Sequence, residues 1–159
     1  MATVESDVRI NEGTSADLDA VMTVMEAAFG RTYGEAWTRS QLAGILPMTG
    51  VSLSVACDMR DHQIVGFALD RRVADEAELL LLAVLPERHR RGVGRNLLED
   101  FLARSRNCGL SKVHLEVRDG NPATVMYRQG GFEAVGRRRN YYHSPGGERH
   151  DAITLALQL

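Results

Sequence analysis

The chain has 159 residues, of which 44% are hydrophobic and 25% are charged, and its formal net charge at pH 7 is −2. This length suits one domain, spanning residues 1–159, that buries a substantial core. The small negative charge gives no general reason to expect nucleic-acid binding. No apolar run approaches the ~20 residues of a membrane span, and residues 1–7 are too acidic to open a signal peptide. We therefore expect a cytoplasmic protein that contacts neither nucleic acid nor membrane.

Cysteine and histidine usage indicates neither disulfides nor a metal centre. The two cysteines, Cys57 and Cys108, are isolated in the sequence. Neither has a second cysteine or a histidine at metal-ligand spacing. We expect two reduced thiols and no bound metal.

The first third of the chain predicts a strand and two helices. Residues 8–10 alternate as a short strand does, and Thr14 with Asp17 forms a capping-box pattern before apolar residues at helical spacing. That helix should end near Gly30. A second capping-box pattern, Thr38 with Gln41, predicts a helix that ends by residue 50.

The middle of the chain predicts three strands and a longer helix. Residues 51–55 and 64–69 alternate and form a hairpin across a polar turn. Residues 77–84 are apolar on both faces, which is typical of a central, buried strand. A helix then extends to about Asn107, with Gly109 beyond it as a stop signal.

The last third predicts strands around one short helix. Residues 112–117 alternate, Asn121-Pro122 opens a helix with proline at its first position, and Gly130-Gly131 ends it. Two further strands, residues 132–136 and 152–157, flank a polar loop. The order β-α-α-β-β-β-α-β-α-β-β predicts an α/β domain on a mixed sheet.

Residues 90–95, Arg-Arg-Gly-Val-Gly-Arg, carry the clearest functional signal. They connect the buried strand to a helix, so unpaired backbone N–H groups and the positive end of the helix dipole converge there. The stretch lacks the Lys-Ser/Thr of a P-loop and the third glycine of a dinucleotide fingerprint. It predicts a phosphate site of another kind; the alternative is a glycine-containing helix start with basic neighbours.

Arg-Arg-Gly-x-Gly before an amphipathic helix resembles the pyrophosphate loop of the GCN5-related N-acetyltransferases (GNAT superfamily), whose pattern is Gln/Arg-x-x-Gly-x-Gly/Ala. His89 stands at the first position of that pattern. The order of elements is similar to that fold, and residues 78–157 resemble the bacterial ribosomal-protein-alanine N-acetyltransferases of the RimI type. Three passages carry the closer likeness: Leu115-Glu116-Val117-Arg118 followed by Asn121, Tyr127-Arg128-Gln129-Gly130-Gly131-Phe132, and residues 136–142 ahead of Asp151-Ala152. Trp37-Thr38 also resembles the opening of the family's second helix, with Ala36 in place of a proline.

The resemblance implies a GNAT fold, a mixed and mostly antiparallel sheet flanked by about four helices, and acetyl-CoA as co-substrate. It places the cofactor against the backbone of the fourth strand, the glycine loop, and two residues further on. These are Leu82, Ala83, Val84, His89, Arg90, Arg91, Gly92, Val93, Gly94, Arg95, Asn121 and Tyr127. For the acceptor we expect contacts from Trp37, Arg118, Tyr141 and Tyr142.

Acetyl transfer to an amine requires a proton acceptor for the amine and a proton donor for the departing thiolate. Glu116 shares a strand face with Arg118, and Tyr127 sits on the short fourth helix; in the resembling family the matching Glu and Tyr serve as general base and general acid. Each has a structural alternative, because Glu116 also suits a solvated strand face and Tyr127 a packing position. Asn121 is most simply an N-cap residue, and contact with the cofactor arm, as in the resembling family, is the secondary interpretation.

The aromatic and basic residues of 137–142 leave two interpretations open. Tyr141 and Tyr142 suit either packing or contact with a peptide substrate. The triplet 137–139, three consecutive arginines, suits either a solvated surface or contact with an acidic or RNA-rich partner.

We expect transfer of acetyl from acetyl-CoA to a protein N-terminal α-amine, the N-terminal alanine of a small-subunit ribosomal protein. An α-amine, with a pKa of about 7.7–8.0, needs less help from one carboxylate than a lysine at about 10.4. One alternative is an acetyltransferase of the same fold that acts on lysine, a polyamine or another small amine. Another is a non-catalytic acyl-CoA sensor. The spacing from Asn121 to Tyr127 favours this alternative, because it is one residue shorter than in the subfamily.

Overall fold

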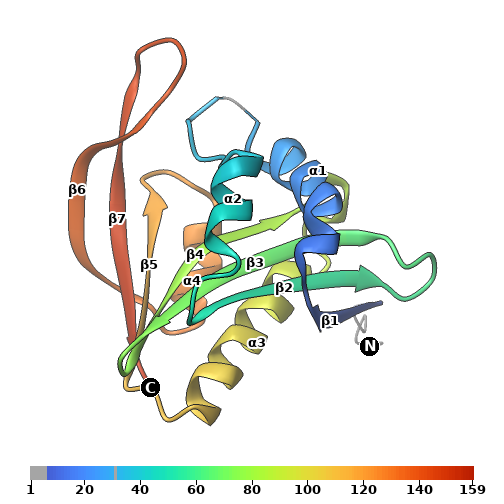
Figure 1. Ribbon diagram of the computed structural model, residues 1–159. Coiled ribbons are helices and arrows are strands. Elements are labelled where there is room, and N and C mark those ends of the chain that lie inside the picture. The colour runs from blue at the N-terminus through green and yellow to red at the C-terminus, as the bar shows by residue number, and fades with distance from the viewer. Residues whose placement is uncertain (1–6, 31) are drawn as a thin grey trace, which may run out of the picture.

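The computed structural model describes residues 7–30 and 32–159 as one seven-stranded sheet with helices on both faces (Figure 1). The strands are β1 (Val8–Glu12), β2 (Val51–Asp58), β3 (Ile64–Val73), β4 (Glu76–Val84), β5 (Lys112–Arg118), β6 (Glu133–His143) and β7 (Arg149–Gln158). The helices are α1 (Leu18–Phe29), α2 (Arg39–Ile45), α3 (Val93–Asn107) and α4 (Ala123–Gln129), with 3-10 turns η1 (Ser15–Asp17) and η2 (Pro86–Arg88). The element order predicted from the sequence is confirmed.

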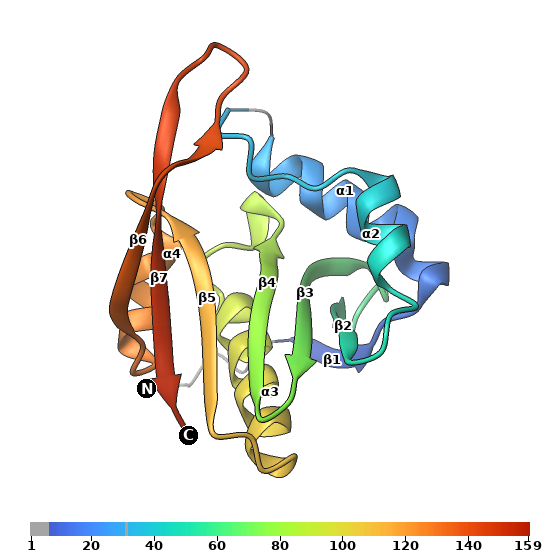
Figure 2. The same cartoon turned by 60° about the vertical axis from the view of Figure 1, so that its left-hand side comes forward.

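The strands are arranged in the order β1-β2-β3-β4-β5-β7-β6, which places β4 at the centre. Every neighbouring pair is antiparallel except β4 with β5. Helices α1 and α2 cover one face of the sheet, and α3 and α4 cover the other (Figures 1 and 2). The core lies between these layers and is centred on fully buried side chains such as Met25, Phe67, Leu97 and Phe101.

The two central strands separate halfway along their length (Figure 2). Pairing between β4 and β5 begins at Glu76 with Lys112 and ends at Leu79 with Leu115. Strand β4 continues to Val84 with only β3 beside it. A bulge coincides with this point, because Leu69 pairs with Leu81 and Asp70 with Leu79, leaving Leu80 without a partner in β3. One edge of β4 beyond the bulge is therefore free of strand pairing.

Local signals account for the helix ends. Thr14 and Thr38 each accept a hydrogen bond from the backbone of the following turn, and Asp17 and Gln41 complete both capping boxes. Helix α4 begins at Ala123 rather than at the preceding proline, which occupies the N-cap. Among the described residues, no helix combines the length and apolar character needed to cross a membrane.

The sequence predicts a polar loop between residues 136 and 152, and the predicted length of this loop is wrong. Strand β6 continues to His143 and β7 starts at Arg149, so only five residues, 144–148, join them. Polar side chains on an exposed edge strand conceal the alternation that identifies a strand. A bulge interrupts the hairpin at Asn140, which has a φ of 55° and whose N–H donates to Asp151 Oδ1 at 2.9 Å.

Candidate active site

The glycine loop ends in a helix start that is open to an anion. Arg90 (φ 62°) and Gly92 (φ 80°) both adopt left-handed backbone conformations, and α3 begins at Val93. The N–H groups of a first helical turn have no intrahelical partner, and no side chain caps α3. A Cβ on Gly94 would lie 3.3 Å from Met126 Sδ and 3.7 Å from Leu82 Cδ2. The turn is thus packed closely against both β4 and α4, beside the free edge of β4.

Three contacts hold the segment that leads into this loop. Arg88 Nη1 lies 2.5 Å from Asp58 Oδ2, and the Arg60 backbone N–H donates to Asp58 Oδ1 at 2.8 Å. The Arg60 N–H and, to a smaller extent, the Arg88 guanidinium hold the pKa of the Asp58 carboxyl below its usual range. His89 Nε2 donates to the Val84 carbonyl oxygen at 3.0 Å. The imidazole therefore fastens the loop to the last residue of β4.

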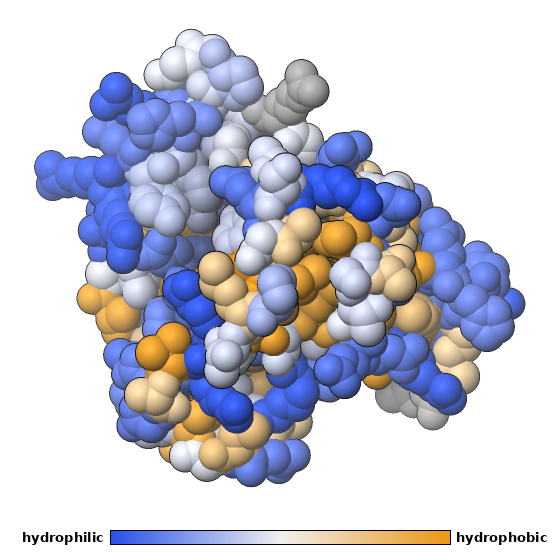
Figure 3. Space-filling view, viewed as in Figure 1, coloured by the Kyte–Doolittle hydropathy of each residue, from blue (hydrophilic) through white to orange (hydrophobic). Residues whose placement is uncertain are grey.

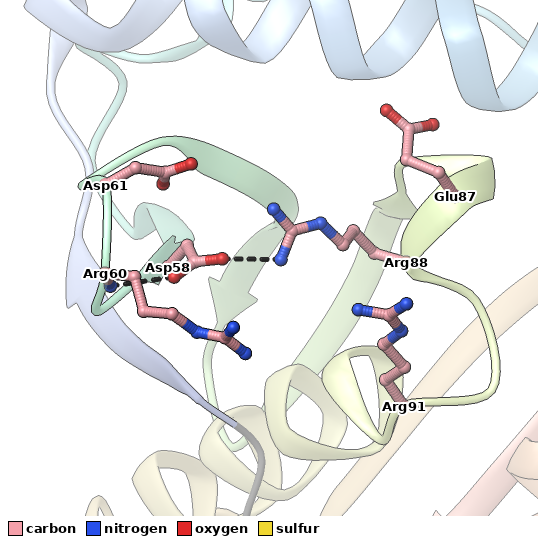
Figure 4. Close-up of a pocket in the computed structure, with 6 residues that line it drawn as sticks. All are labelled: Asp58, Arg60, Asp61, Glu87, Arg88 and Arg91. Atoms are coloured by element: carbon pink, nitrogen blue, oxygen red, sulfur yellow. Dashed lines mark hydrogen bonds and ion pairs between the residues drawn. The ribbon is translucent and has the colours of Figure 1, made fainter.

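A polar hollow of about 340 Å³ lies beside the loop (Figure 4). Three arginines and three carboxylates line it: Arg60, Arg88, Arg91, Asp58, Asp61 and Glu87. Its charges balance, and Arg88 is already paired with Asp58 (Figure 4). The side chain of Arg91 lines this hollow, so what Arg91 offers at the helix start is its backbone. The hollow contains no part of the β4 edge and is not the candidate site.

Glu116 lies on β5 close to the end of the strand, with a side chain that is only 13% exposed. Its carboxylate is not simply solvated, because Arg138 Nε lies 2.6 Å from Glu116 Oε1. Burial raises the pKa of the nearby Tyr141 hydroxyl, and the charge of Glu116 adds to this effect. The Arg138 guanidinium lies 5.6 Å from the centre of the Tyr141 ring.

Tyr127 is buried on α4, with 5% of its surface exposed. Its ring meets Phe132 edge to face at 5.9 Å between centroids. Burial raises the pKa of Tyr127 well above its usual range, with a smaller contribution from Tyr142. Burial raises the pKa of Tyr142 too, with smaller contributions from Glu35, Tyr141 and Glu116. Both phenols therefore keep their protons at neutral pH.

Glu35, in the segment between α1 and α2, is the site residue that the sequence analysis missed. Its Oε1 lies 3.1 Å from Arg118 Nε, and its Oε2 accepts from Asn121 Nδ2 at 3.1 Å. Arg118 also stacks on Tyr33, with 3.6 Å from Cζ to the ring centroid. Asn121 Oδ1 accepts from the Ala123 N–H at 2.9 Å, so this side chain supports the start of α4 from the position before the N-cap proline. The polar groups of Arg118 and Asn121 thus order the α1–α2 segment against the ends of β5 and α4.

The same segment is held against the β6–β7 hairpin (Figures 1 and 2). Gly34 has a φ of 70°, and a Cβ there would lie 2.2 Å from the His143 carbonyl oxygen, so only glycine fits. Tyr33 meets His150 edge to face at 5.1 Å. Trp37 follows, half-buried against the core. The surface over the hairpin is mainly hydrophilic, whereas apolar residues gather around α2 (Figure 3).

Comparisons with known proteins identify this arrangement. A family model described as an acetyltransferase (GNAT) domain matches residues 24–144. The chain belongs to this family. It is 38% identical over 101 residues to the ribosomal protein bS18-alanine N-acetyltransferase of Haemophilus influenzae, covering 64% of this chain and 69% of the relative. The matching enzyme of Escherichia coli is 40% identical over 101 residues, covering 63% and 68%.

Solved structures agree with the assignment. The crystal structure of the ribosomal-protein-S18-alanine N-acetyltransferase from Escherichia coli superposes with a TM-score of 0.84 at 30% identity, over 95% of this chain and 93% of that one. The resemblance to the RimI type and the GNAT fold expected from the sequence are confirmed. The GNAT family uses acetyl-CoA as its co-substrate, so the candidate site must accommodate this molecule.

Replacing Glu35 with glutamine should lower the free energy of unfolding by about 1–3 kcal/mol, because the Arg118 guanidinium then stays buried without a counter-charge. Urea titration followed by circular dichroism measures this loss. Glu26→Gln, on the exposed surface of α1, is the matched control and should stay within about 0.5 kcal/mol of the parent. Equal urea midpoints for the two variants would contradict a structural role for the Glu35–Arg118 pair.

Proposed function

We propose that this acetyltransferase moves the acetyl group of acetyl-CoA to the free α-amine of a protein N-terminus, with the N-terminal alanine of a small-subunit ribosomal protein as acceptor. The observation that carries the proposal is one nearly buried carboxylate, Glu116, one residue past the last β4–β5 pair, together with one buried phenol, Tyr127, on α4. The names of the Haemophilus influenzae and Escherichia coli relatives support the choice of acceptor.

The residues around the glycine loop fit acetyl-CoA. Its phosphates match the open N–H groups from Gly92 to Arg95 at the start of α3. The amides of its pantetheine arm match the unpaired edge of β4 from Leu82 to Val84, although the Val84 carbonyl already accepts from His89. Acetyl-CoA supplies the acetyl group as a thioester; the protein residues supply binding, orientation and proton transfer.

In the proposed mechanism, Glu116 accepts a proton from the acceptor ammonium, directly or through one water. The neutral nitrogen then attacks the thioester carbonyl carbon, the carbon–sulfur bond breaks, and the new amide nitrogen releases its second surplus proton to water. Tyr127, protonated because burial raises its pKa, donates its proton to the departing sulfur. Acceptor contacts are assigned to Trp37, Tyr141 and Tyr142, which border Glu116 or the α1–α2 segment. Arg118 contributes to acceptor binding indirectly: its ion pair with Glu35 holds the α1–α2 segment in place.

The acceptor preference is tested with two short peptides that differ in which amine is free. One carries a free N-terminal alanine and no lysine; the other has a blocked α-amine and one free internal lysine. We expect coenzyme A release with the first peptide alone, because one carboxylate deprotonates an α-amine more readily. Release with the lysine peptide alone would move the function to lysine or small-amine acetylation. Acetyl-CoA binding without release on either peptide would favour a sensor.

Glu116→Gln and Tyr127→Phe should each lower kcat by roughly 10²–10⁴-fold while leaving acetyl-CoA affinity within about twofold of the parent. Each change removes one proton-transfer group and preserves side-chain shape. Steady-state kinetics and calorimetric titration with acetyl-CoA provide the two readouts. Glu133→Gln, on exposed β6, serves as the control. Full turnover by either variant would remove that residue from the mechanism.

A further inference from the structure

Arg138 is placed to reach Glu116 across an intervening strand. Glu116 on β5 lies opposite Thr154 on β7, which lies opposite Gly136 on β6. Arg138 is two residues beyond Gly136 and therefore shares its face of the sheet. Its own partner on β7 is Ala152. Position 136 is glycine and position 152 is alanine, so little side-chain bulk stands beside Arg138, and the arginine lies over β7 to contact Glu116 on β5.

The other members of the arginine triplet have different surroundings. Arg137 points to the opposite face, where its Nη1 contacts Asp119 Oδ2 at 2.9 Å and Asp151 Oδ2 at 2.7 Å. Arg139, at the irregularity in the strand pairing, is exposed. Within the described chain, Arg138 is therefore the arginine of this triplet that pairs with the carboxylate at the site.

The two partners of this ion pair differ sharply in exposure. The Glu116 side chain is 13% exposed, whereas that of Arg138 is 63% exposed. The carboxylate is thus fixed inside the site, and the guanidinium reaches it from the solvent side. The cation is free to swing outward without opening the core, because its stem rests on an edge strand.

A guanidinium on Glu116 is incompatible with the proton transfer proposed above. Arginine keeps its proton throughout the physiological range and has no acceptor atom, so it neither gives Glu116 a proton nor relays one. An acceptor ammonium carries the same charge and also presents N–H donors. The two cations compete for Glu116 Oε1, which Arg138 Nε contacts at 2.6 Å.

We propose that Arg138 is a built-in competitor of the acceptor: its guanidinium occupies the position of the acceptor ammonium on Glu116 and leaves when the acceptor peptide binds. This inference rests on the proposed function of Glu116. It makes Arg138 a specificity-determining residue, because an amine that does not displace the guanidinium has no access to the base.

Removing the competitor should tighten acceptor binding. Arg138→Ala should lower KM for the alanine peptide roughly three- to fivefold, the range expected for one partly exposed ion pair, and leave kcat within about twofold. Arg138→Lys should restore the parental KM, because an ammonium replaces the guanidinium. Arg139→Ala removes the same charge from the next residue and should leave both constants unchanged.

A second measurement separates competition from a general charge effect. Peptide affinity is determined by calorimetry for four proteins saturated with coenzyme A: the parent, Arg138→Ala, Glu116→Gln and the double variant. Arg138→Ala should tighten binding in the parent background and have no effect in the Glu116→Gln background, where no carboxylate remains to be contested. Equal tightening in both backgrounds would overturn the proposal, as would tightening by Arg139→Ala.

The kinetic outcomes distinguish the inference from the function on which it rests. A fall in kcat for Arg138→Ala with KM unchanged would mean that Arg138 positions Glu116, and the competitor role would be wrong. An unchanged KM with normal turnover would also overturn it while leaving the proposed function intact. A parent protein that binds acetyl-CoA but transfers nothing to any N-terminal peptide would overturn both.

Discussion

The separation of β4 from β5 beyond the Leu79–Leu115 pair is the constraint on which the rest of the site depends. Backbone N–H and C=O groups away from water need partners, and a strand edge in the middle of a sheet offers them to a ligand. The bulge at Leu80 lies at the same point. Gly94 brings the start of α3 against this stretch of β4, so the uncapped N–H groups of the helix start lie beside the unpaired strand edge.

Two ion pairs bracket that surface and attach irregular segments to strand ends. Arg88 with Asp58 holds the approach to the glycine loop, and Glu35 with Arg118 holds the α1–α2 segment. Three of these four side chains are at most 10% exposed. Buried pairs add little net stability relative to apolar packing, but losing one partner is costly. Their value here is that they fix where the two segments lie on either side of the site.

The parts that the sequence predicts well are those with local signals. Two capping boxes, the buried run of β4 and the glycine loop that opens α3 depend on residues a few positions apart. Glu35 escaped because its partner Arg118 is 83 positions away and no periodicity links them. The sequence does not predict the full length of β6, because the residues of this strand are exposed and polar. It does not predict the partner of Arg138 either, because Glu116 lies two strands away. Such contacts depend on strand order, which no local pattern encodes.

The most direct test of the account is amide hydrogen exchange with and without acetyl-CoA, read at single-residue resolution. If the free β4 edge and the open start of α3 hold the ligand, protection should rise in two segments, 82–84 and 92–95. Residues 58–61 and 87–88, which line the polar hollow, should change little. Protection confined to the hollow, with 82–84 and 92–95 exchanging as in the free protein, would contradict the central role of the β4–β5 separation.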